Sequence, residues 1–480
     1  GNDEELKAAY NYFFENSDYT VDAVDYAGFY AFNYSPAAIF RKKNWVVSMR
    51  SITSKFWGAE IYSGQNRFGR YQSHGSLDVL YDGSLAANGY PTNNAVGGWD
   101  WNVVPGTTTV HYTSWLDMMP AQSTTQRFDQ YSKEKNFSGA LAMDSNGIFA
   151  TDFSQIDKWG NTECYLPTNL EFKKSMFAFG DMIICMGSDI TSSGMYSDDM
   201  VTATNLFQNI VTDYVGDLVV NGEMAIQGES RIIGDNDNWF ITPAGTGYFV
   251  PKGNDPIVLT YGEQTTPSQT GADYVSPTGK AYIDHGVKPT GAKDIFVVIP
   301  SVTVPKMITL SQQLQNHGGE LFRVEAQSAN LHALTYLPGN TTAYAFFDAV
   351  DGLDFGIVKA TTFRHLLMVH QDAVKNRYKF AVCNPDLCPE DDVSYGWHST
   401  SSSTTLTVNG NWELVEPVDG VMICSNSQAE TLISVTMNDG APIYFELKTP
   451  DDTGLEECDS WEDNIRVKKV LGGVQLIFNN

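Results

Sequence analysis

Short apolar segments alternate with turn residues along most of the chain. From about residue 20 onward, runs such as FYAFNY, NWVVSMRSI, SMFAFGDMIICMG and PIYFEL are separated by turn sequences such as MDSNG, GDNDN, VNGN and MNDG. Apolar runs of this length, bounded by Gly, Asn, Asp and Ser, are typical of β-strands. Several runs lack strict alternation, as expected for strands buried on both faces of stacked sheets. The pattern predicts a mostly β protein with antiparallel, multi-sheet β-sandwich architecture.

The beginning of the chain and a segment near residue 385 mark the expected divisions. The segment DEELKAAYNYFF is the best helix candidate, with Asp3 as its N-cap. The segment CNPDLCPEDD combines two prolines with an acidic cluster and precedes the polar stretch HSTSSSTTLT. We therefore expect a short helical segment over residues 1–25, a large β-sandwich domain over residues 26–384 and a small C-terminal β domain over residues 385–480.

Composition indicates a packed globular protein with an acidic surface. Of the 480 residues, 42% are hydrophobic and 18% are charged, which argues against disorder. The net charge of -27 argues against a general nucleic-acid binder, because phosphate binding needs a positive field. Aromatic residues make up 12% of the chain, and both sugar-binding surfaces and large β-sandwich cores would account for them.

Basic residues gather in one part of this acidic chain. Residues 41–70 contain only one acid, Glu60, and seven basic residues: Arg41, Lys42, Lys43, Arg50, Lys55, Arg67 and Arg70. Residues 385–460 contain fifteen acids and one base, Lys448. A positive island on an acidic protein focuses a local field and attracts an anionic ligand. The alternative is a set of scattered surface charges.

The cysteines, the apolar runs and the acid pairs limit what can be said about disulfides, membrane segments and metal sites. Six cysteines (Cys164, Cys185, Cys383, Cys388, Cys424 and Cys458) show no zinc-binding spacing, and they fix neither a disulfide pattern nor a compartment. We find no apolar run long enough to span a membrane and no signal peptide, and the start Gly-Asn-Asp suggests a processed or trimmed end. Acid pairs such as Asp198–Asp199 leave a structural calcium ion open, but lone acid pairs are usually solvated. We predict no metal and no cofactor.

Two polar segments carry the candidate sugar-binding residues. The segment NRFGRYQSHG contributes Asn66, Arg67, Arg70, Tyr71 and His74, and the segment GGWDWNVVPGTTT contributes Trp99 and Trp101. On a strand, Arg70, Gln72 and His74 would share one face, where Arg suits sulfate or carboxylate. The alternative for the first group is a set of hydrogen bonds that stabilise the fold. The two tryptophans either stack on sugar rings or belong to the core, and we favour the core for one of them.

The order of four segments resembles polysaccharide lyase family 8, and within it the chondroitin ABC lyases. The segments are NWVVSMRS, GQNRFGRYQSHG, GWDWNVVPGTTT and LEFKKSMFAFGDMIICMGSDI, and the likeness spans roughly residues 27–210. The resemblance implies a helical toroid, then a galactose-mutarotase-like super-sandwich, then a smaller C-terminal β domain. Only the β parts match this sequence, so residues 1–25 would connect to a toroid that the sequence lacks.

The chemistry implied by the resemblance is β-elimination on a uronic acid. Such a reaction needs the carboxylate neutralised, a base for the C5 proton and an acid for the leaving oxygen. In the family an Asn, a His and a Tyr come from the toroid, and an Arg and a Glu come from the sheet domain. Arg50 matches the Arg, which would lower the pKa of the Tyr hydroxyl. Ser54 stands where many relatives have a second Arg.

Glu163 is the first candidate for the Glu, because of its separation from Arg50 in sequence, and Glu171 is the second; either could simply be a solvated loop acid. We expect a glycosaminoglycan lyase acting on a chondroitin, dermatan or hyaluronan type of polymer, secreted or periplasmic, with this chain supplying only its β part. We do not expect activity of this chain alone, because the His and Tyr of the toroid are absent. The alternative is a non-catalytic carbohydrate-binding or accessory protein with the same fold. A structural sandwich that binds no sugar is the least favoured interpretation.

Overall fold

The protein is built almost entirely from antiparallel β-sheets, as the sequence predicts. A computed structural model describes residues 4, 7, 26–61, 66, 68–91, 98–118, 128–155, 158–159, 162–163, 168–194, 196–212, 215–267, 273–388, 398–450, 465–470 and 473–478. Of the expected N-terminal helical segment, only Glu4 and Lys7 are described, and both are helical. The rest of that prediction lies outside the described residues.

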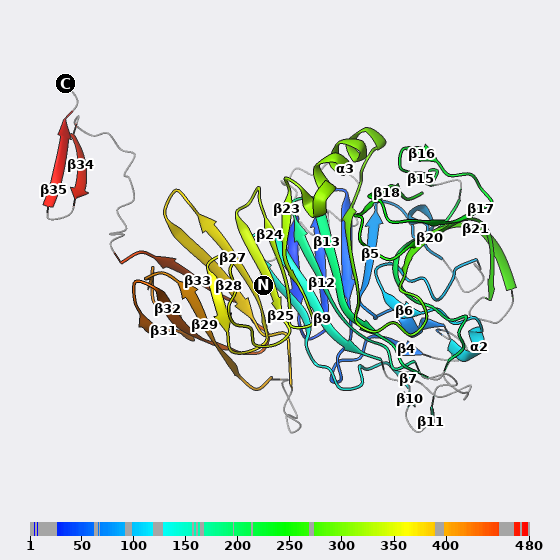
Figure 1. The fold of residues 1–480 in the computed structure, drawn as a ribbon, viewed down its shortest axis with the longest axis horizontal. Coiled ribbons are helices and arrows are strands. Elements are labelled where there is room, and N and C mark those ends of the chain that lie inside the picture. Colours follow the sequence, from blue (N-terminus) through cyan, green and yellow to red (C-terminus); the bar gives the residue numbers. More distant parts are fainter. Residues whose placement is uncertain are drawn as a thin grey trace.

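The first sandwich places one large sheet against two smaller ones (Figure 1). The large sheet has the order β16 (Glu223–Met224), β15 (Val219–Val220), β18 (Asn238–Ile241), β19 (Gly247–Val250), β22 (Ala292–Ile299), β13 (Met182–Thr191), β12 (Glu171–Phe179), β9 (Asn146–Ser154) and β8 (Ser138–Met143). A five-stranded sheet has the order β17 (Glu229–Ile233), β20 (Ile257–Pro267), β21 (Asp273–Asp284), β14 (Thr202–Ile210) and β6 (Thr108–Val110). A four-stranded sheet has the order β1 (Gly28–Phe32), β2 (Ala37–Lys42), β3 (Trp45–Arg50) and β5 (Ser76–Tyr81).

The central strands of the large sheet are buried on both faces. In β12, Met176 and Ala178 belong to the core shared with the two smaller sheets. Their neighbours Phe177 and Phe179 point to the opposite face and join a second core. Successive residues of a strand point to opposite faces, so both must be apolar when both faces are covered. This confirms the prediction that an apolar run without strict alternation, such as SMFAF, is a strand buried on both faces.

A second sandwich covers the other face of the large sheet (Figure 1). Its seven-stranded sheet has the order β23 (Phe322–Gln327), β24 (Leu331–Tyr336), β25 (Thr341–Phe346), β27 (His365–Asp372), β28 (Arg377–Cys383), β33 (Ile443–Lys448) and β30 (Glu413–Leu414). Its four-stranded sheet has the order β26 (Val358–Thr361), β29 (Ser402–Asn409), β32 (Glu430–Met437) and β31 (Val421–Asn426). Ala343 and Ala345 of β25 face the large sheet, whereas Tyr344 and Phe346 face the four-stranded sheet. The sheets therefore stack as successive layers.

The expected division between residues 384 and 385 falls inside this second sandwich. β28 comes before that point and β33 after it, yet the two strands pair, with Phe380 opposite Phe445. One core joins residues from both sides of the division. The sheets divide earlier, near helix α3 (Val304–Gly318), which packs Met307 and Leu314 into the core between the sandwiches. The Pro-rich segment near residue 385 is therefore a connection within a sandwich.

Shorter elements and the cysteines complete the described chain. The minor elements are η1 (Gly69–Tyr71), η2 (Ala86–Asn88), α2 (Trp115–Met118) and the pairs β4–β7 (Glu60–Ile61 with Phe128–Asp129), β10–β11 (Lys158–Trp159 with Thr162–Glu163) and β34–β35 (Ile465–Val470 with Gly473–Phe478). The described cysteines, Cys185, Cys383, Cys388 and Cys424, are free thiols. Within the described ranges, no helix has both the length and the apolar character needed to cross a membrane.

Candidate functional site

Arg50 ends β3 and projects from the face of its sheet that lies opposite the core. It pairs with Ala37 of β2 and Ser76 of β5, and its side chain is exposed. The guanidinium donates a hydrogen bond to the carbonyl oxygen of Gly58, in the loop that follows β3. Partial desolvation lowers the pKa of Arg50, while the nearby carboxylate of Asp78 acts in the opposite direction. The loop therefore orients an accessible, permanently charged group.

Asp78 interacts electrostatically with Arg50 and forms a hydrogen bond with Tyr90. Neither Asp78 nor Tyr90 was predicted as a site residue. The Tyr90 hydroxyl donates to Asp78 Oδ1 at 3.0 Å. Burial raises the pKa of Asp78 to about 6, against the effects of this hydrogen bond and of Arg50. Burial also raises the pKa of Tyr90 well above its usual value, so its phenol stays protonated and donates. The sequence signal was an acid at a polar position inside the strand SLDVLY.

The predicted positive island is divided between the two ends of β3. Lys42 pairs with Trp45 at one end of the β2–β3 hairpin, and Ala37 pairs with Arg50 at the other. At ~3.3 Å per strand residue, five residues place Lys42 roughly 16 Å from Arg50 along the strand. Arg70 is buried, and Arg67 lies outside the described residues. The clustering in sequence therefore does not produce one basic patch from Arg41, Lys42, Lys43, Arg50 and Arg70.

The segment around Arg70 is a tight turn and not the expected strand. Gly69–Tyr71 form the short helix η1, and Gly75 follows with φ of +71°, a conformation that favours glycine. The expectation that Arg70, Gln72 and His74 share one strand face is therefore wrong. Asn66 braces the turn by donating to the Glu60 carbonyl at 2.8 Å and to Gln72 Oε1 at 3.1 Å.

Three of the predicted sugar-binding side chains in this segment are buried. The Arg70 guanidinium lies 5.1 Å from the centroid of the Tyr112 ring and donates to the Met118 carbonyl at 3.3 Å. Tyr71 donates to the Val110 carbonyl at 2.6 Å. The exposed fractions of Arg70, Tyr71 and His74 are 1%, 0% and 1%. This corrects the expectation of direct sugar contacts, because these side chains hold the turn together from within.

His74 is a packed, neutral histidine. Its ring lies 5.0 Å from the Tyr71 ring and 4.5 Å from the Phe153 ring, measured between centroids. Burial lowers the pKa of His74 well below its usual value, and the positive charges of Arg70 and Lys174 act in the same direction. A positive charge on this ring would be costly beside those two cations.

Trp99 and Trp101 both belong to the core of the candidate site. Their exposed fractions are 4% and 9%, so stacking on a sugar ring is closed to both in this conformation. Trp99 lies against the Tyr90 ring at 5.8 Å, and Trp101 lies against the Phe68 ring at 5.7 Å. The indole nitrogen of Trp101 donates to the Pro267 carbonyl at 3.1 Å. Both tryptophans are therefore core residues, where we expected this for one of them, and the expected sugar contact of the other is corrected.

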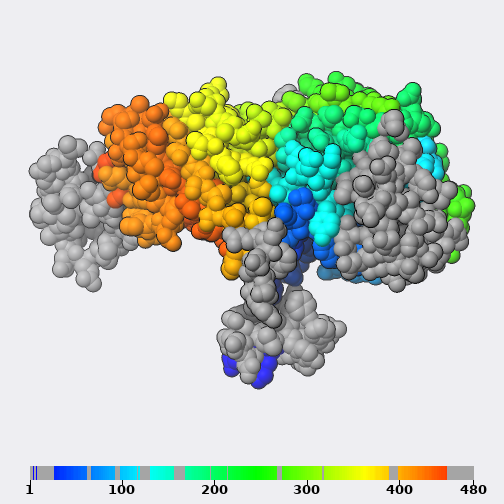
Figure 2. Space-filling model, turned by 90° about the horizontal axis from the view of Figure 1, so that it is seen from below, coloured from blue at the N-terminus to red at the C-terminus, as the bar shows by residue number. Residues whose placement is uncertain are grey.

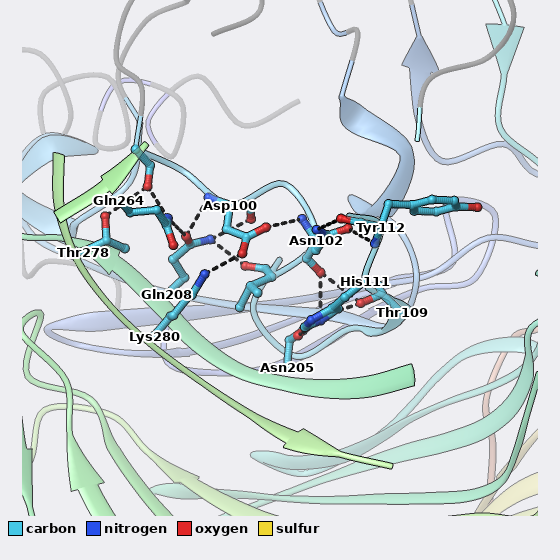
Figure 3. Close-up of polar contacts among 12 residues, drawn as sticks. Asp100, Asn102, Thr109, His111, Tyr112, Asn205, Gln208, Gln264, Thr278 and Lys280 are labelled. Atoms are coloured by element: carbon cyan, nitrogen blue, oxygen red, sulfur yellow. Dashed lines mark hydrogen bonds and ion pairs between the residues drawn. The ribbon is translucent and has the colours of Figure 1, made fainter. Parts of the chain in front are cut away.

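A buried ion pair anchors the turn that carries these tryptophans (Figure 3). Lys280 Nζ of β21 lies 2.5 Å from Asp100 Oδ2, and Asp100 Oδ1 accepts from the backbone of Asn102 at 3.0 Å. Burial alone would raise the pKa of Asp100, but Lys280 and His111 together bring it below its usual value. The carboxylate is therefore ionised and joins the turn to the five-stranded sheet.

Three amide side chains extend this anchor (Figure 3). Gln208 Oε1 accepts from the backbone of Asp100 at 2.8 Å, and Gln264 donates to Gln208 Oε1 at 3.0 Å. Asn205 Nδ2 donates to the Asn102 carbonyl at 3.0 Å, and Asn205 Oδ1 accepts from His111 Nε2 at 2.9 Å. These contacts satisfy the polar groups of a turn that would otherwise be buried unpaired. The segment is thus a rigid platform next to the Arg50 sheet.

The structure does not decide between the two candidate glutamates. Glu163 lies in β11, opposite Lys158 of β10, and its side chain is outside the described part of the chain. Glu171 is the exposed first residue of β12. No described contact joins either residue to Arg50. In the parts of the chain that are described, no three His, Cys, Asp or Glu side chains gather as metal ligands.

Comparisons with known proteins agree with this architecture. A chondroitin sulfate ABC endolyase of Proteus vulgaris is 28% identical over 387 residues, which cover 80% of this chain and 36% of that protein. A chondroitin sulfate ABC exolyase of Bacteroides thetaiotaomicron is 28% identical over 463 residues, which cover 88% of this chain and 42% of that protein. The chain thus spans about two fifths of the length of these two relatives.

A solved structure shows the same fold, and a family model gives the family. A Paenibacillus xanthan lyase has the same fold, with a TM-score of 0.71 and 17% identity, covering 99% of this chain and 44% of that one. The model of the super-sandwich domain of polysaccharide lyase family 8 matches residues 27–311, which is more than half of the chain. The chain therefore belongs to polysaccharide lyase family 8.

Proposed function

We propose that this chain is the β-sheet part of a lyase that cleaves a uronic-acid-containing glycosaminoglycan by β-elimination. The polymer class is inferred from relatives named as chondroitin and hyaluronate lyases. We further propose that the enzyme is secreted or periplasmic and needs neither metal nor cofactor. Residues beyond this sequence, joined through residues 1–25, would supply the proton-transfer groups.

The observation that carries the proposal is the state of Arg50. Arg50 is an exposed residue, its guanidinium donates to the Gly58 carbonyl, and the half-buried carboxylate of Asp78 interacts with its charge. Elimination builds negative charge on the uronate carboxylate side of the sugar, and a fixed cation stabilises that charge. Arg50 would supply this charge directly, or would favour the phenolate of a tyrosine from the other part of the enzyme.

Other candidates have supporting roles in this proposal. Asn66 is partly exposed, and because its two N–H groups donate to Glu60 and Gln72, its amide oxygen would offer an acceptor to the polymer. Arg70, Tyr71 and His74 would act through the turn that they hold and not by touching sugar. Either Glu163 or Glu171 would orient Arg50 or the sugar once the remaining part of the site is assembled.

The test is an activity assay on the protein extended by its upstream residues. Elimination creates a conjugated double bond, so ultraviolet absorbance rises as chondroitin or hyaluronan is cleaved. We expect Arg50→Ala to lower kcat at least a hundredfold, and Arg50→Lys to restore only part of it, because Lys lacks the planar fork. Lys43→Ala is the matched control, since it removes an exposed charge at the opposite end of β3.

Two results would contradict the proposal. Absence of any absorbance rise on every uronic-acid polymer, with polymer binding retained, would favour a binding protein of the same fold. Full activity of Arg50→Ala would remove Arg50 from the reaction while leaving the family assignment in place.

A further inference from the structure

A polar pocket of about 380 Å³ lies between the two sandwiches. This volume is within the range of small-molecule sites. Seven polar side chains line it, three from the first sandwich and four from the second: Lys135, Asp152, Lys173, Asn330, Asp348, Thr362 and Arg364. In the view from below, the cyan part of the first sandwich and the yellow and orange part of the second adjoin one another (Figure 2). The pocket is thus built by elements that come together only in the folded protein.

The cations of this pocket are already paired. Lys135 Nζ lies 3.3 Å from Asp152 Oδ2, and Lys173 Nζ lies 3.9 Å from Asp152 Oδ1 and 3.2 Å from Asp189. Asp152 is 7% exposed and forms the floor. These pairs fix the positions of the donors and acceptors at the base of the pocket.

The wall from the second sandwich carries a similar balance. Arg364 forms an ion pair with Asp386. The three cations of the lining are Lys135, Lys173 and Arg364. Four carboxylates balance them: Asp152 and Asp348, which line the pocket, and Asp189 and Asp386, which pair with Lys173 and Arg364. An anionic group entering the pocket would therefore meet no net positive charge. The charge balance favours an uncharged ligand that needs both donors and acceptors.

A sugar ring has this chemistry. Lys and Arg only donate, carboxylates only accept, and Asn does both, so the lining can satisfy hydroxyls of either orientation. Phe347 and Phe363 also line the pocket, but Phe347 is buried and Phe363 only partly exposed, so recognition would rest on hydrogen bonds. Asp348 and Asn330 are exposed at the rim. Asp348 Oδ1 accepts from the backbone of Ala349 at 2.8 Å, and Oδ2 has no partner among the described residues.

We propose that this pocket is a carbohydrate-binding site, separate from Arg50, that takes an uncharged sugar unit such as an N-acetylhexosamine. It rests on the proposed function, because it assumes that the protein handles a polysaccharide. Thr151 and Asp152 are consecutive residues of β9, so their side chains point to opposite faces of the large sheet. Thr151 faces the sheet of Arg50, with Ser51 Oγ 3.0 Å from Thr151 Oγ1, whereas Asp152 faces the second sandwich, so the large sheet separates the pocket from Arg50.

The experiment measures binding of N-acetyl-D-galactosamine and of D-glucuronic acid to the 480-residue chain by saturation-transfer NMR titration. We expect the neutral sugar to bind at least tenfold more tightly than the acid. Asp348→Ala should weaken binding of the neutral sugar about tenfold or more, because a charged acceptor is lost. Asn330→Ala should weaken it in the same direction.

Asp351→Ala is the matched control. Asp351 lies three residues beyond Asp348 in the same exposed loop and likewise accepts from the next backbone amide, at 2.6 Å from Gly352. Binding by this variant should stay within twofold of the unaltered chain. Absence of saturable binding of the neutral sugar, or equal binding by Asp348→Ala and Asp351→Ala, would overturn the inference. Because this chain alone is titrated, a failure of lyase activity in the longer protein is a distinct result.

Discussion

Arg50 and Asp78 lie diagonally across the β3–β5 strand pair, and the charge of each favours the ionised form of the other. Arg50 is opposite Ser76, and Asp78 is opposite Ser48, so all four side chains share the face away from the core. Desolvation still dominates for the carboxyl, which is why its pKa is about 6. The arrangement places a titrating group beside the best candidate for substrate charge recognition.

Asp78 makes the free energy of unfolding depend on pH in a defined window. Its folded pKa of about 6 lies above the value of about 4 for an unfolded chain, so the folded state binds more protons between these values. Stability contributed by the protonated form is therefore lost as pH rises from about 4 to 6. We expect Asp78→Asn, which keeps an acceptor for Tyr90, to be more stable than the unaltered chain at pH 7.5 by about 1–2 kcal/mol.

Urea unfolding at pH 4 and pH 7.5 checks this. The two proteins should be similar at pH 4 and should diverge at pH 7.5. Asp82→Asn, in the exposed turn after β5, is the control and should follow the unaltered chain at both values. Parallel stability curves for Asp78→Asn and the unaltered chain would show that Asp78 does not titrate in this window.

Gly58 is expected to be intolerant of a side chain. A Cβ at this position would overlap the side chains of Ile52 and Ser73, so the loop would have to move. The Gly58 carbonyl accepts from Arg50, and its displacement would release the guanidinium. We expect Gly58→Ala to cost about 1–3 kcal/mol of stability and to lower lyase activity of the longer protein at least tenfold.

The matched variant for this prediction is Gly234→Ala. A Cβ at Gly234 meets nothing within 4 Å, and the residue is exposed. It should change neither the thermal unfolding midpoint nor the rate of absorbance increase. If Gly58→Ala kept full activity with a normal midpoint, the Arg50–Gly58 contact would have no role in positioning the guanidinium.

Local patterns predicted the strands but not the turn that holds the candidate site. Runs such as SMFAF are apolar throughout because both faces of β12 are covered, and this is visible in the sequence. The segment NRFGRYQSHG also shows alternation of Arg70, Gln72 and His74, which suggested a strand. Gly69 and Gly75, on either side of these residues, were the better signal and indicate a turn, since Gly75 adopts positive φ.

Long-range partners could not be read from the sequence. Lys280 and Asp100 are 180 residues apart, and nothing in either local segment shows that β21 reaches the tryptophan turn. The same applies to the division near residue 385, where local composition is typical of a linker, yet β33 returns to pair with β28. Burial of Arg70 also depends on packing against Tyr112, which comes 42 residues later.

The Asp100–Lys280 pair should be strongly coupled. Both side chains are largely buried, with exposed fractions of 15% and 13%, so removal of one leaves the other charge unpaired. We expect Asp100→Ala and Lys280→Met each to cost about 2–4 kcal/mol, and the double variant to cost at least ~1 kcal/mol less than the sum. Urea unfolding of the four proteins measures this. Lys306→Met, on the exposed face of α3, is the control, and simple additivity would contradict the coupling.

His285 should also stabilise the fold in a pH-dependent manner. Neighbouring carboxylates raise its folded pKa, whereas burial raises the folded pKa of Asp78. The buried His285 ring lies 2.7 Å from Asp255 through Nδ1 and 3.5 Å from Asp294 through Nε2. Burial alone would lower the pKa of His285, but these two carboxylates raise it to about 9. The stabilisation is therefore fully present below pH 6.5, the ordinary value for histidine, and is lost as pH rises through 9.

We expect His285→Gln to be less stable than the unaltered chain by on the order of 2–3 kcal/mol at pH 6, with a smaller difference at pH 9.5. The comparison between two proteins at each pH matters, because Lys174 is also buried, with a pKa lowered to about 8. A lysine whose folded pKa is lowered gains stability as pH rises, which opposes the histidine. Lys174 is present in both proteins, so only the change in its coupling through Asp294 enters the difference. Urea unfolding at the two pH values measures the gap. A gap that stays constant from pH 6 to 9.5 would mean that His285 is neutral in the folded protein.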